Sequence, residues 1–160
     1  MLPGLLALNS DVQLFADPGS VGTLAEAGVT ATPVEPGDTL DLATPVQVFG
    51  ETHAVIHRDI PMIGNVGFVL RSEGQPTLFH PGDALTAVPS GVDILAVPMM
   101  GPWAAMKETI DFVREVGALE GFPIHDELLS DRGRGLILNR VNDMTDTRLV
   151  DLRGGAAHDF

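Results

Sequence analysis

Apolar and polar residues alternate with a period of two along several short segments in the first half of the chain, and turn residues separate these segments. The alternation is clearest in Thr39–Leu42 and Val46–Phe49, and the stretch from Glu73 to Pro76 has the composition of a hairpin turn. Turns recurring roughly every eight residues favour an antiparallel sheet. The predicted strands are Val12–Phe15, Val29–Val34, Thr39–Leu42, Val46–Phe49, Ala54–His57, Val66–Leu70 and Thr77–His80.

The second half of the chain has a different pattern. Val92–Val97 is a mostly apolar run typical of a buried strand, and Pro102–Val116 combines a proline near its start with apolar residues at helical spacing. A strand at Gly121–Ile124 and a helix at Arg134–Met144 follow, and Ser20 is predicted to cap an early helix at 21–27. We therefore predict a single α+β domain over residues 1–150, with helices outside a sheet, and a flexible tail over 151–160.

Composition narrows the classes of function. The 160 residues contain 44% apolar residues but no run of about 20, so we expect a folded, cytoplasmic protein without a membrane partner. With 22 acidic and 9 basic residues the net charge is -13, which works against binding nucleic acid or anionic lipid. Because the chain has no cysteine, a metal site must be built from His, Asp and Glu.

Histidines and one aspartate stand where three predicted strands end. His53 follows the strand at 46–49, His80 and Asp83 follow the strand at 77–80, and His125 follows the strand at 121–124. Imidazole nitrogens and carboxylate oxygens are the ligands that a cation such as Zn²⁺ takes when cysteine is absent. Taken singly, each histidine is better explained as a hydrogen-bonded loop or core residue, and Asp83 as part of a turn. Trp103 is better explained as packing at a helix start.

The order of these motifs resembles the metallo-β-lactamase-fold hydrolases. Within that superfamily it is most similar to the branch of metal-dependent hydrolases related to ascorbate-phosphate lactonase. The resemblance covers Leu5 to Ser130, and its most specific parts are Asn65–Leu70, His80–Asp83 and the triplet Gly101-Pro102-Trp103. It implies an αββα sandwich that is incomplete at its N-terminus.

The resemblance also implies a metal site, with zinc as the expected cofactor. Asp83 matches the catalytic carboxylate that bridges two metals, His125 matches the last ligand of the second metal, and His53 matches the histidine that completes the first. His57 remains an alternative to His53, and His80 is expected beside the site rather than on a metal. The implied reaction is attack of activated water on an ester, lactone, amide or phosphoester of a small-molecule substrate.

The most specific motif of that family, His-x-His-x-Asp-His, is missing from this sequence, which has no histidine before His53. The opening residues, 1–6, resemble the helix that follows this motif, so an N-terminally truncated form is expected. Each metal would keep one histidine and the shared Asp83, fewer than the usual three protein ligands, and we expect weak or absent metal binding and an inactive or impaired chain.

Two alternatives to a truncated hydrolase remain open at this point. The first is a non-catalytic binding module derived from the same fold. The second is complementation, in which a partner or a second copy supplies the missing imidazoles. Loss of N-terminal strands would expose a sheet edge, and this predicts a homo-oligomer formed through that edge.

Overall fold

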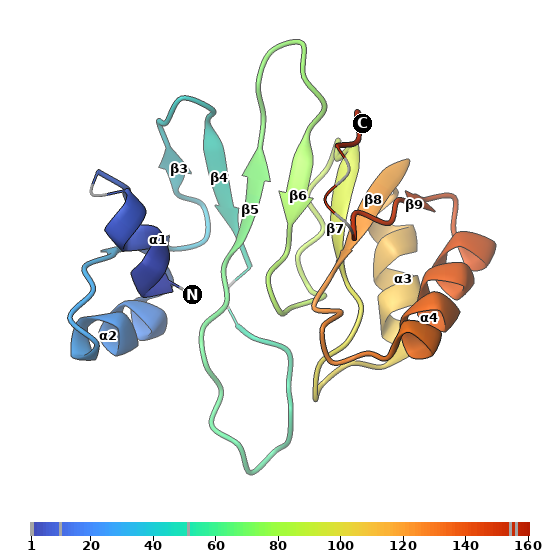
Figure 1. The fold of residues 1–160 in the computed structure, drawn as a ribbon, viewed down its shortest axis with the longest axis horizontal. Helices are drawn as coiled ribbons and strands as arrows, with labels where there is room; N and C mark the ends of the chain where they lie inside the picture. The colour runs from blue at the N-terminus through green and yellow to red at the C-terminus, as the bar shows by residue number, and fades with distance from the viewer. Residues whose placement is uncertain (1, 10, 51, 154, 156) are drawn as a thin grey trace.

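A computed structural model describes residues 2–9, 11–50, 52–153, 155 and 157–160, and its main feature is a seven-stranded sheet (Figure 1). The strands are adjacent in the order in which they occur along the chain, antiparallel from β3 to β6 and parallel from β6 to β9. They are β3 (Thr39–Leu40), β4 (Val46–Phe49), β5 (Gly67–Leu70), β6 (Leu78–His80), β7 (Ile94–Pro98), β8 (Glu120–Ile124) and β9 (Arg148–Leu149). The antiparallel sheet predicted for the first half of the chain is confirmed for β3 to β6. The strands predicted at Val12–Phe15 and Val29–Val34 do not join it, because the pairing there is limited to Phe15–Ala16 with Thr32–Pro33, in parallel and in a separate sheet.

Four helices accompany the sheets: α1 (Leu2–Leu8), α2 (Pro18–Glu26), α3 (Met106–Val116) and α4 (Asp131–Met144). The helix α2 packs against a separate pair of parallel strands, β1 (Phe15–Ala16) and β2 (Thr32–Pro33). The cap predicted at Ser20 is wrong, because the Asp17 side chain accepts hydrogen bonds from the backbone N–H groups of Gly19 and Ser20 at 3.0 and 3.1 Å. Asp17 directly precedes a proline at the first helical position, which is where an N-cap residue belongs.

Three other expectations differ from the structure. The strand predicted at Ala54–His57 is a loop that leaves the sheet after a bridge between Thr52 and Gly64. The helix predicted from Pro102 begins at Met106, because Pro102 and Trp103 form a turn, and the two-residue strand β9 was not predicted. Met1, Ser10, Glu51, Gly154 and Ala156 lie outside the described residues, so the predicted tail at 151–160 is described only in part.

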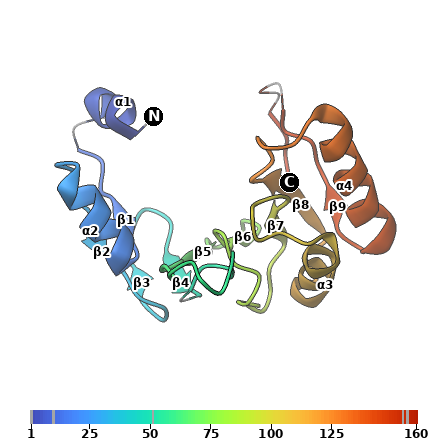
Figure 2. The same cartoon turned by 90° about the horizontal axis from the view of Figure 1, so that it is seen from below.

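The core lies between the sheet and the two C-terminal helices. Both helices lie on the convex side of the curled sheet (Figure 2), and all five residues of β7 are buried. Alternation in β6 points Phe79 into this core and leaves Leu78 and His80 on the other face. Large side chains of the core are Val69, Phe79, Leu95, Val97, Ile110, Phe112, Val113 and Val141.

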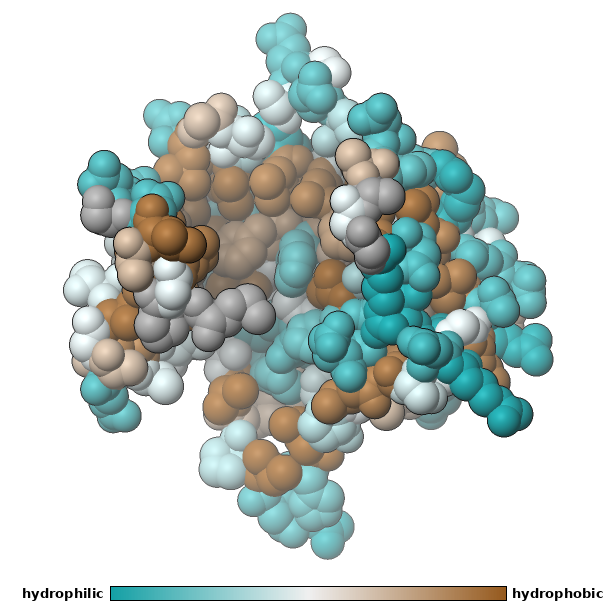
Figure 3. Space-filling model, viewed as in Figure 1, coloured by the Kyte–Doolittle hydropathy of each residue, from teal (hydrophilic) through white to brown (hydrophobic). Residues whose placement is uncertain are grey.

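The concave face of the sheet is open and apolar. A hollow of about 560 Å³ lies over β3–β6 and appears as the brown centre of the surface in Figure 3. Its apolar lining includes Phe15, Leu40, Leu42, Val66, Phe68, Leu70 and Leu78. The α+β class is thus confirmed, with one helix-covered sheet, and among the described residues the second sheet is the small β1–β2 pair. None of the helices in the described part of the chain is long and apolar enough to cross a membrane.

Candidate active site

Strand direction brings the predicted site residues to one edge of the sheet. Because β4 and β6 are each antiparallel to β5, they run in the same direction, and β8 runs parallel to them through β7. Residues that follow these strands therefore emerge at the same edge, which is the lower edge in Figure 1. His53, Asp83 and His125 meet there, although His125 comes 72 positions after His53 in the sequence.

The orientation of His53 is fixed by the backbone beside it. Its Nδ1 lies 2.6 Å from the carbonyl oxygen of Ala54, and since a carbonyl can only accept, Nδ1 carries the proton and donates it. The other ring nitrogen, Nε2, lies 3.0 Å from Oδ2 of Asp83. The imidazole is nearly buried, with 10% of its side chain exposed, so this nitrogen faces the carboxylate in a confined space.

Asp83 contacts two imidazoles at once, one through each carboxylate oxygen. Oδ2 faces His53, while Oδ1 contacts Nε2 of His125. The turn that presents Asp83 is held by Asn65, whose side chain donates to the Pro81 carbonyl at 2.9 Å and accepts from the Asp83 backbone N–H at 2.8 Å. Asn65 is buried, and its two bonds hold the backbone of the turn from which the Asp83 side chain reaches the cluster.

A glycine is required at the middle of this turn. Gly82 has a φ of 69°, in the left-handed region that other residues rarely adopt. A Cβ atom there would lie 2.2 Å from Oδ1 of Asn65, so a side chain would also displace the residue that holds the turn.

His125 is placed by a strained backbone. Its φ of 54° makes it the one non-glycine residue in the left-handed region among the residues that the structure describes. Such a conformation costs about 1–2 kcal/mol and persists only where the surroundings enforce it.

Trp103 packs edge-on against both imidazoles, with ring centroids 6.1 Å from His53 and 6.4 Å from His125.

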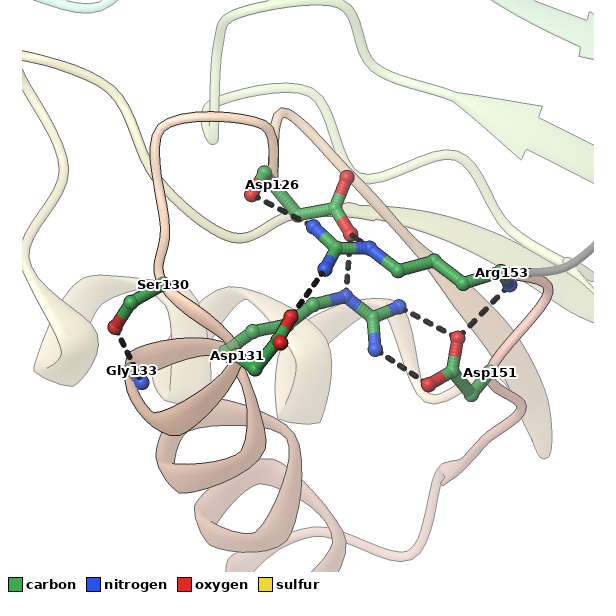
Figure 4. Close-up of polar contacts among 7 residues, drawn as sticks. Asp126, Ser130, Asp131, Gly133, Asp151 and Arg153 are labelled. Carbon is green, nitrogen blue, oxygen red and sulfur yellow. Dashed lines mark hydrogen bonds and ion pairs between the residues drawn. The ribbon is translucent and has the colours of Figure 1, made fainter.

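The residue after His125 belongs to an ion-pair network, which we call the arginine clamp. Arg134 on α4, whose side chain is 7% exposed, donates from Nε to Asp126 at 2.5 Å and from both terminal nitrogens to Asp151 at 2.5 and 2.9 Å. Arg153 approaches the same Asp126 carboxylate at 3.2 Å and donates to the Asp126 carbonyl at 3.1 Å (Figure 4). The clamp thus joins residues beyond the last strand to the loop that carries His125.

Two further histidines lie near this edge but are not in the cluster. His57 lies on the exposed loop, where its Nδ1 accepts from the backbone N–H of Asp59 at 3.2 Å and 57% of its side chain is exposed. His80 accepts from the Gly82 N–H through Nδ1 at 3.2 Å. Burial, and after it the charge of nearby His125, lowers the pKa of His80 below its usual 6.5. His57 thus lies outside the cluster that contains His53, and His80 lies beside that cluster.

A cleft of about 330 Å³ opens over the cluster. It is lined by His53, Asp83, His125, Ile56, Met100, Gly101, Pro102, Trp103, Glu127 and Leu128. Within the described residues no group of three His, Cys, Asp or Glu side chains is arranged to hold a single ion. The cluster instead forms two adjoining pairs, each of one imidazole and one oxygen of Asp83.

Sequence reasoning gave no role to Asn65 or to the arginine clamp. Asn65 stood in a matched segment, but its partners lie 16 and 18 residues away and no local pattern links them. Arg134 lies eight residues after Asp126 and seventeen residues before Asp151, and neither spacing belongs to a local motif. Arg134 stands at the start of the predicted helix at 134–144, and nothing in the sequence marks it as buried.

Comparison with known proteins gives a relative and a fold. No protein-family profile matches the chain. Protein Rv0786c of Mycobacterium tuberculosis is 38% identical over 148 residues, which span 91% of this chain and 68% of that protein.

Solved structures share the fold at low sequence identity. Igni18, a metallo hydrolase of Ignicoccus hospitalis, has a TM-score of 0.63 and 12% identity, with 94% of this chain and 70% of Igni18 covered. The diiron β-hydroxylase CmlA of Streptomyces venezuelae has a TM-score of 0.59 and 14% identity over 88% of this chain and 39% of CmlA. The metallo-β-lactamase-fold protein YhfI of Bacillus subtilis has a TM-score of 0.55 and 11% identity over 86% of this chain and 60% of YhfI.

These matches confirm the predicted fold and leave the ascorbate-phosphate-lactonase-like branch a prediction. The chain has the metallo-β-lactamase fold and belongs to the same protein family as Protein Rv0786c of Mycobacterium tuberculosis.

Proposed function

We propose that this chain carries part of the active site of a metal-dependent hydrolase, in which Asp83 bridges two zinc-type ions and His53 and His125 each bind one. The observation that carries the proposal is the facing of Nε2 of His53 and Oδ2 of Asp83 across 3.0 Å. When its only ring proton is on Nδ1, the Nε2 atom of His53 carries a lone pair and faces Oδ2 of Asp83, which is also an acceptor. Two acceptors at this distance attract each other only when a proton or a cation lies between them.

The separation of these two atoms suits a shared cation. Ligand nitrogen and oxygen atoms lie about 2.1 Å from zinc, and at angles of about 90–110° two such ligands are about 3.0–3.4 Å apart. The kinds of donor also fit, since imidazole and carboxylate are ligands of zinc, manganese and iron alike. Identity of the ion is therefore part of the proposal rather than fixed by the fold, and among the named solved structures CmlA is a diiron enzyme.

The number of ligands limits what the chain does alone. Each ion would have one imidazole and one oxygen of Asp83, whereas a catalytic zinc generally has three protein ligands. We therefore expect weak metal binding and negligible hydrolysis by these 160 residues without further imidazoles. The relative and the solved structures are longer than the matched region, so the activity of the whole protein is itself a proposal.

The chain's own residues would perform the following tasks. A bound ion supplies Lewis acidity and lowers the pKa of the attacking water. Ala54 holds His53 with Nε2 toward the site, Asn65 holds Asp83 between the two imidazoles, and Trp103 packs against both rings. The cleft beside them would receive the substrate.

Zinc titration of the chelator-treated chain tests the proposal. Trp103, the one tryptophan of the sequence, reports by its emission, and the imidazole NMR signals identify the histidines that respond. We expect zinc to shift the signals of His53 and His125 with weak affinity, and His53→Ala and Asp83→Asn to abolish the response.

The matched control is His57→Ala, which removes the alternative histidine four positions away and should leave the titration unchanged. The proposal is wrong if zinc leaves His53 and His125 unaffected, or if His57→Ala weakens binding as much as His53→Ala. About two tightly bound zinc ions per chain would refute the expected weakness, because two ligands per ion do not supply such affinity.

A further inference from the structure

The backbone is anchored on both sides of His125. Before it, β8 ends at Ile124, whose carbonyl accepts a hydrogen bond from the Met99 N–H at 2.9 Å, so the strand stays tied to the sheet up to that residue. After it, the Asp126 carbonyl accepts from the side chain of Arg153 at 3.1 Å. His125 is therefore the one residue between two anchored points, and the left-handed φ of 54° falls on it.

The second anchor is reinforced by the Asp126 carboxylate. Its Oδ2 atom accepts from Nε of Arg134 at 2.5 Å and lies 3.2 Å from Nε of Arg153, and 16% of the side chain is exposed (Figure 4). Charge-assisted bonds shielded from water are among the strongest that a side chain makes. Because Arg134 is itself held by Asp151, the carboxylate is tied to α4 and to the chain beyond β9.

The left-handed backbone of His125 needs such an anchor. Without one, a residue that has a Cβ atom prefers a relaxed backbone by about five- to thirtyfold. A changed φ would carry the imidazole away from Oδ1 of Asp83 and from the ring of Trp103. His53 does not share this dependence, since the carbonyl of Ala54 holds its ring.

We infer that the arginine clamp positions His125 for its role in the site. Arg134 and Arg153 hold the Asp126 carboxylate, and the anchored Asp126 keeps the preceding backbone left-handed and its imidazole in the cluster. The inference deepens the proposed function, on which its meaning for metal binding rests, by giving the two halves of the site different supports. The half that contains His53 is held by its own loop, whereas the half that contains His125 depends on α4 and on the chain beyond β9.

NMR of the chelator-treated chain tests the inference without metal. Asp126→Ala removes the carboxylate that both arginines contact, and NOEs are recorded from the indole of Trp103 to each imidazole. In wild type both His53 and His125 should show these NOEs, and His125 should show the strong HN–Hα NOE of a residue with positive φ. In Asp126→Ala the NOE between Trp103 and His125 should fall about fivefold or more, while that of His53 stays unchanged.

The matched control is Asp131→Ala. Asp131 also contacts Arg153, at 3.3 Å, but its exposed side chain lies on α4 rather than beside His125, so both NOEs should remain. Asp126→Asn keeps an acceptor for Nε of Arg134 and should restore most of the NOE that Asp126→Ala loses. If Asp126→Ala does not fold, Arg153→Met takes its place and should weaken the same NOE, since it removes two contacts with Asp126 at a side chain that is 36% exposed.

Zinc titration adds a measurement at the site itself. In Asp126→Ala the signals of His125 should need at least about fivefold more zinc to shift, whereas those of His53 should respond as in wild type. A variant that only lowers overall stability would affect both histidines alike, so the difference between them reports positioning.

The inference is overturned if Asp126→Ala leaves the NOE or the zinc response of His125 unchanged, or if it weakens both histidines together. It is also overturned if Asp131→Ala acts like Asp126→Ala, or if Asp126→Asn restores nothing. Because the NOEs are measured without metal, a chain that binds no zinc but loses only the His125 NOE keeps this inference and loses the hydrolase proposal. A wild-type chain that binds zinc at both histidines, with both NOEs intact in Asp126→Ala, keeps the hydrolase proposal and loses this inference.

Discussion

Arg134 offers the sharpest link between stability and the candidate site, because it is a nearly buried cation whose bonds reach both the loop of His125 and the residues after β9. Its side chain is 7% exposed, and its partners are Asp126, 16% exposed, and Asp151, 50% exposed. Replacement by Met keeps much of the apolar stem and removes every hydrogen bond of the guanidinium. The expected result of Arg134→Met is a loss of about 2 kcal/mol of unfolding free energy, for the reasons that follow.

The magnitude comes from the exposure of each partner. The bond to Asp126 is charge-assisted and shielded from water, and such bonds contribute about 1.5–3 kcal/mol. The paired bonds to Asp151 join a carboxylate half open to solvent, so screening reduces them to about 0–1 kcal/mol. Removal of the buried cation also recovers part of its desolvation cost, and Arg153 still contacts Asp126, which brings the net to about 2 kcal/mol.

Chemical and thermal denaturation measure this loss, with Trp103 emission as the probe. For a chain of this size the melting temperature should fall by about 4–8 °C. Arg148→Met is the matched control, since Arg148 is 64% exposed and paired with Glu120, and it should cost no more than about 1 kcal/mol. The reasoning fails if Arg134→Met melts with wild type, or if Arg148→Met or Asp151→Asn costs as much as Arg134→Met.

Three further predictions concern the turn, the network and the open face. Gly82→Ala should cost about 2 kcal/mol or more, because its Cβ would meet Asn65, while Gly74→Ala, with a similar φ of 73° and open space, should cost about 1 kcal/mol in urea denaturation. The hydrogen bonds from Arg134 lower the pKa of Asp151 below its usual 3.8. The ionised Asp151 therefore stabilises the folded state above pH 3.8, and this contribution is lost as the pH falls through the lower pKa that Asp151 has in the folded protein. Below pH 3.8 the urea midpoint should therefore drop more in wild type than in Asp151→Asn. The open apolar face over β3–β6 should cause self-association that rises with concentration in sedimentation and weakens in Phe68→Ser, and a wild-type monomer at every concentration would contradict this.

The sequence predicted best those elements whose pattern and packing agree. Residues 46–49 alternate, and the structure buries Val46 and Val48 on the face that lines the concave hollow and leaves Gln47 exposed on the opposite face. The apolar run at 54–56 misled the same reasoning, because a strand also needs a neighbour with free hydrogen-bonding groups, and this segment has left the sheet. The strand β9 escaped prediction for the opposite reason, since two residues are too short to show a period.

Convergence of the site residues was predictable only in part. The resemblance implied that His53, Asp83 and His125 share one site, but the common direction of the strands they follow was not predicted, because the strand wrongly expected at Ala54–His57 would have reversed it. How the residues are held could not be predicted either, because the supporting contacts are long-range. Asn65 holds Asp83 from 18 positions away, and Arg134 reaches Asp126 and Asp151 from different elements. Such partners are chosen by tertiary packing, which a single sequence does not display.

These supporting contacts bear on why the chain should bind metal weakly. A metal can bind weakly because its ligands are disordered or because the ligands are too few. The first cause does not apply here, since contacts within the protein hold the ligand side chains in place. Ala54 sets the tautomer of His53, Asn65 clamps the turn of Asp83, and the strained backbone of His125 is adjacent to the arginine clamp. Ordering costs are thus largely met before an ion arrives. If the proposed role is right, the limit is ligand number, so imidazoles supplied from outside these residues should raise affinity steeply, whereas loosening the clamp should lower it even though Arg134 touches no ligand atom.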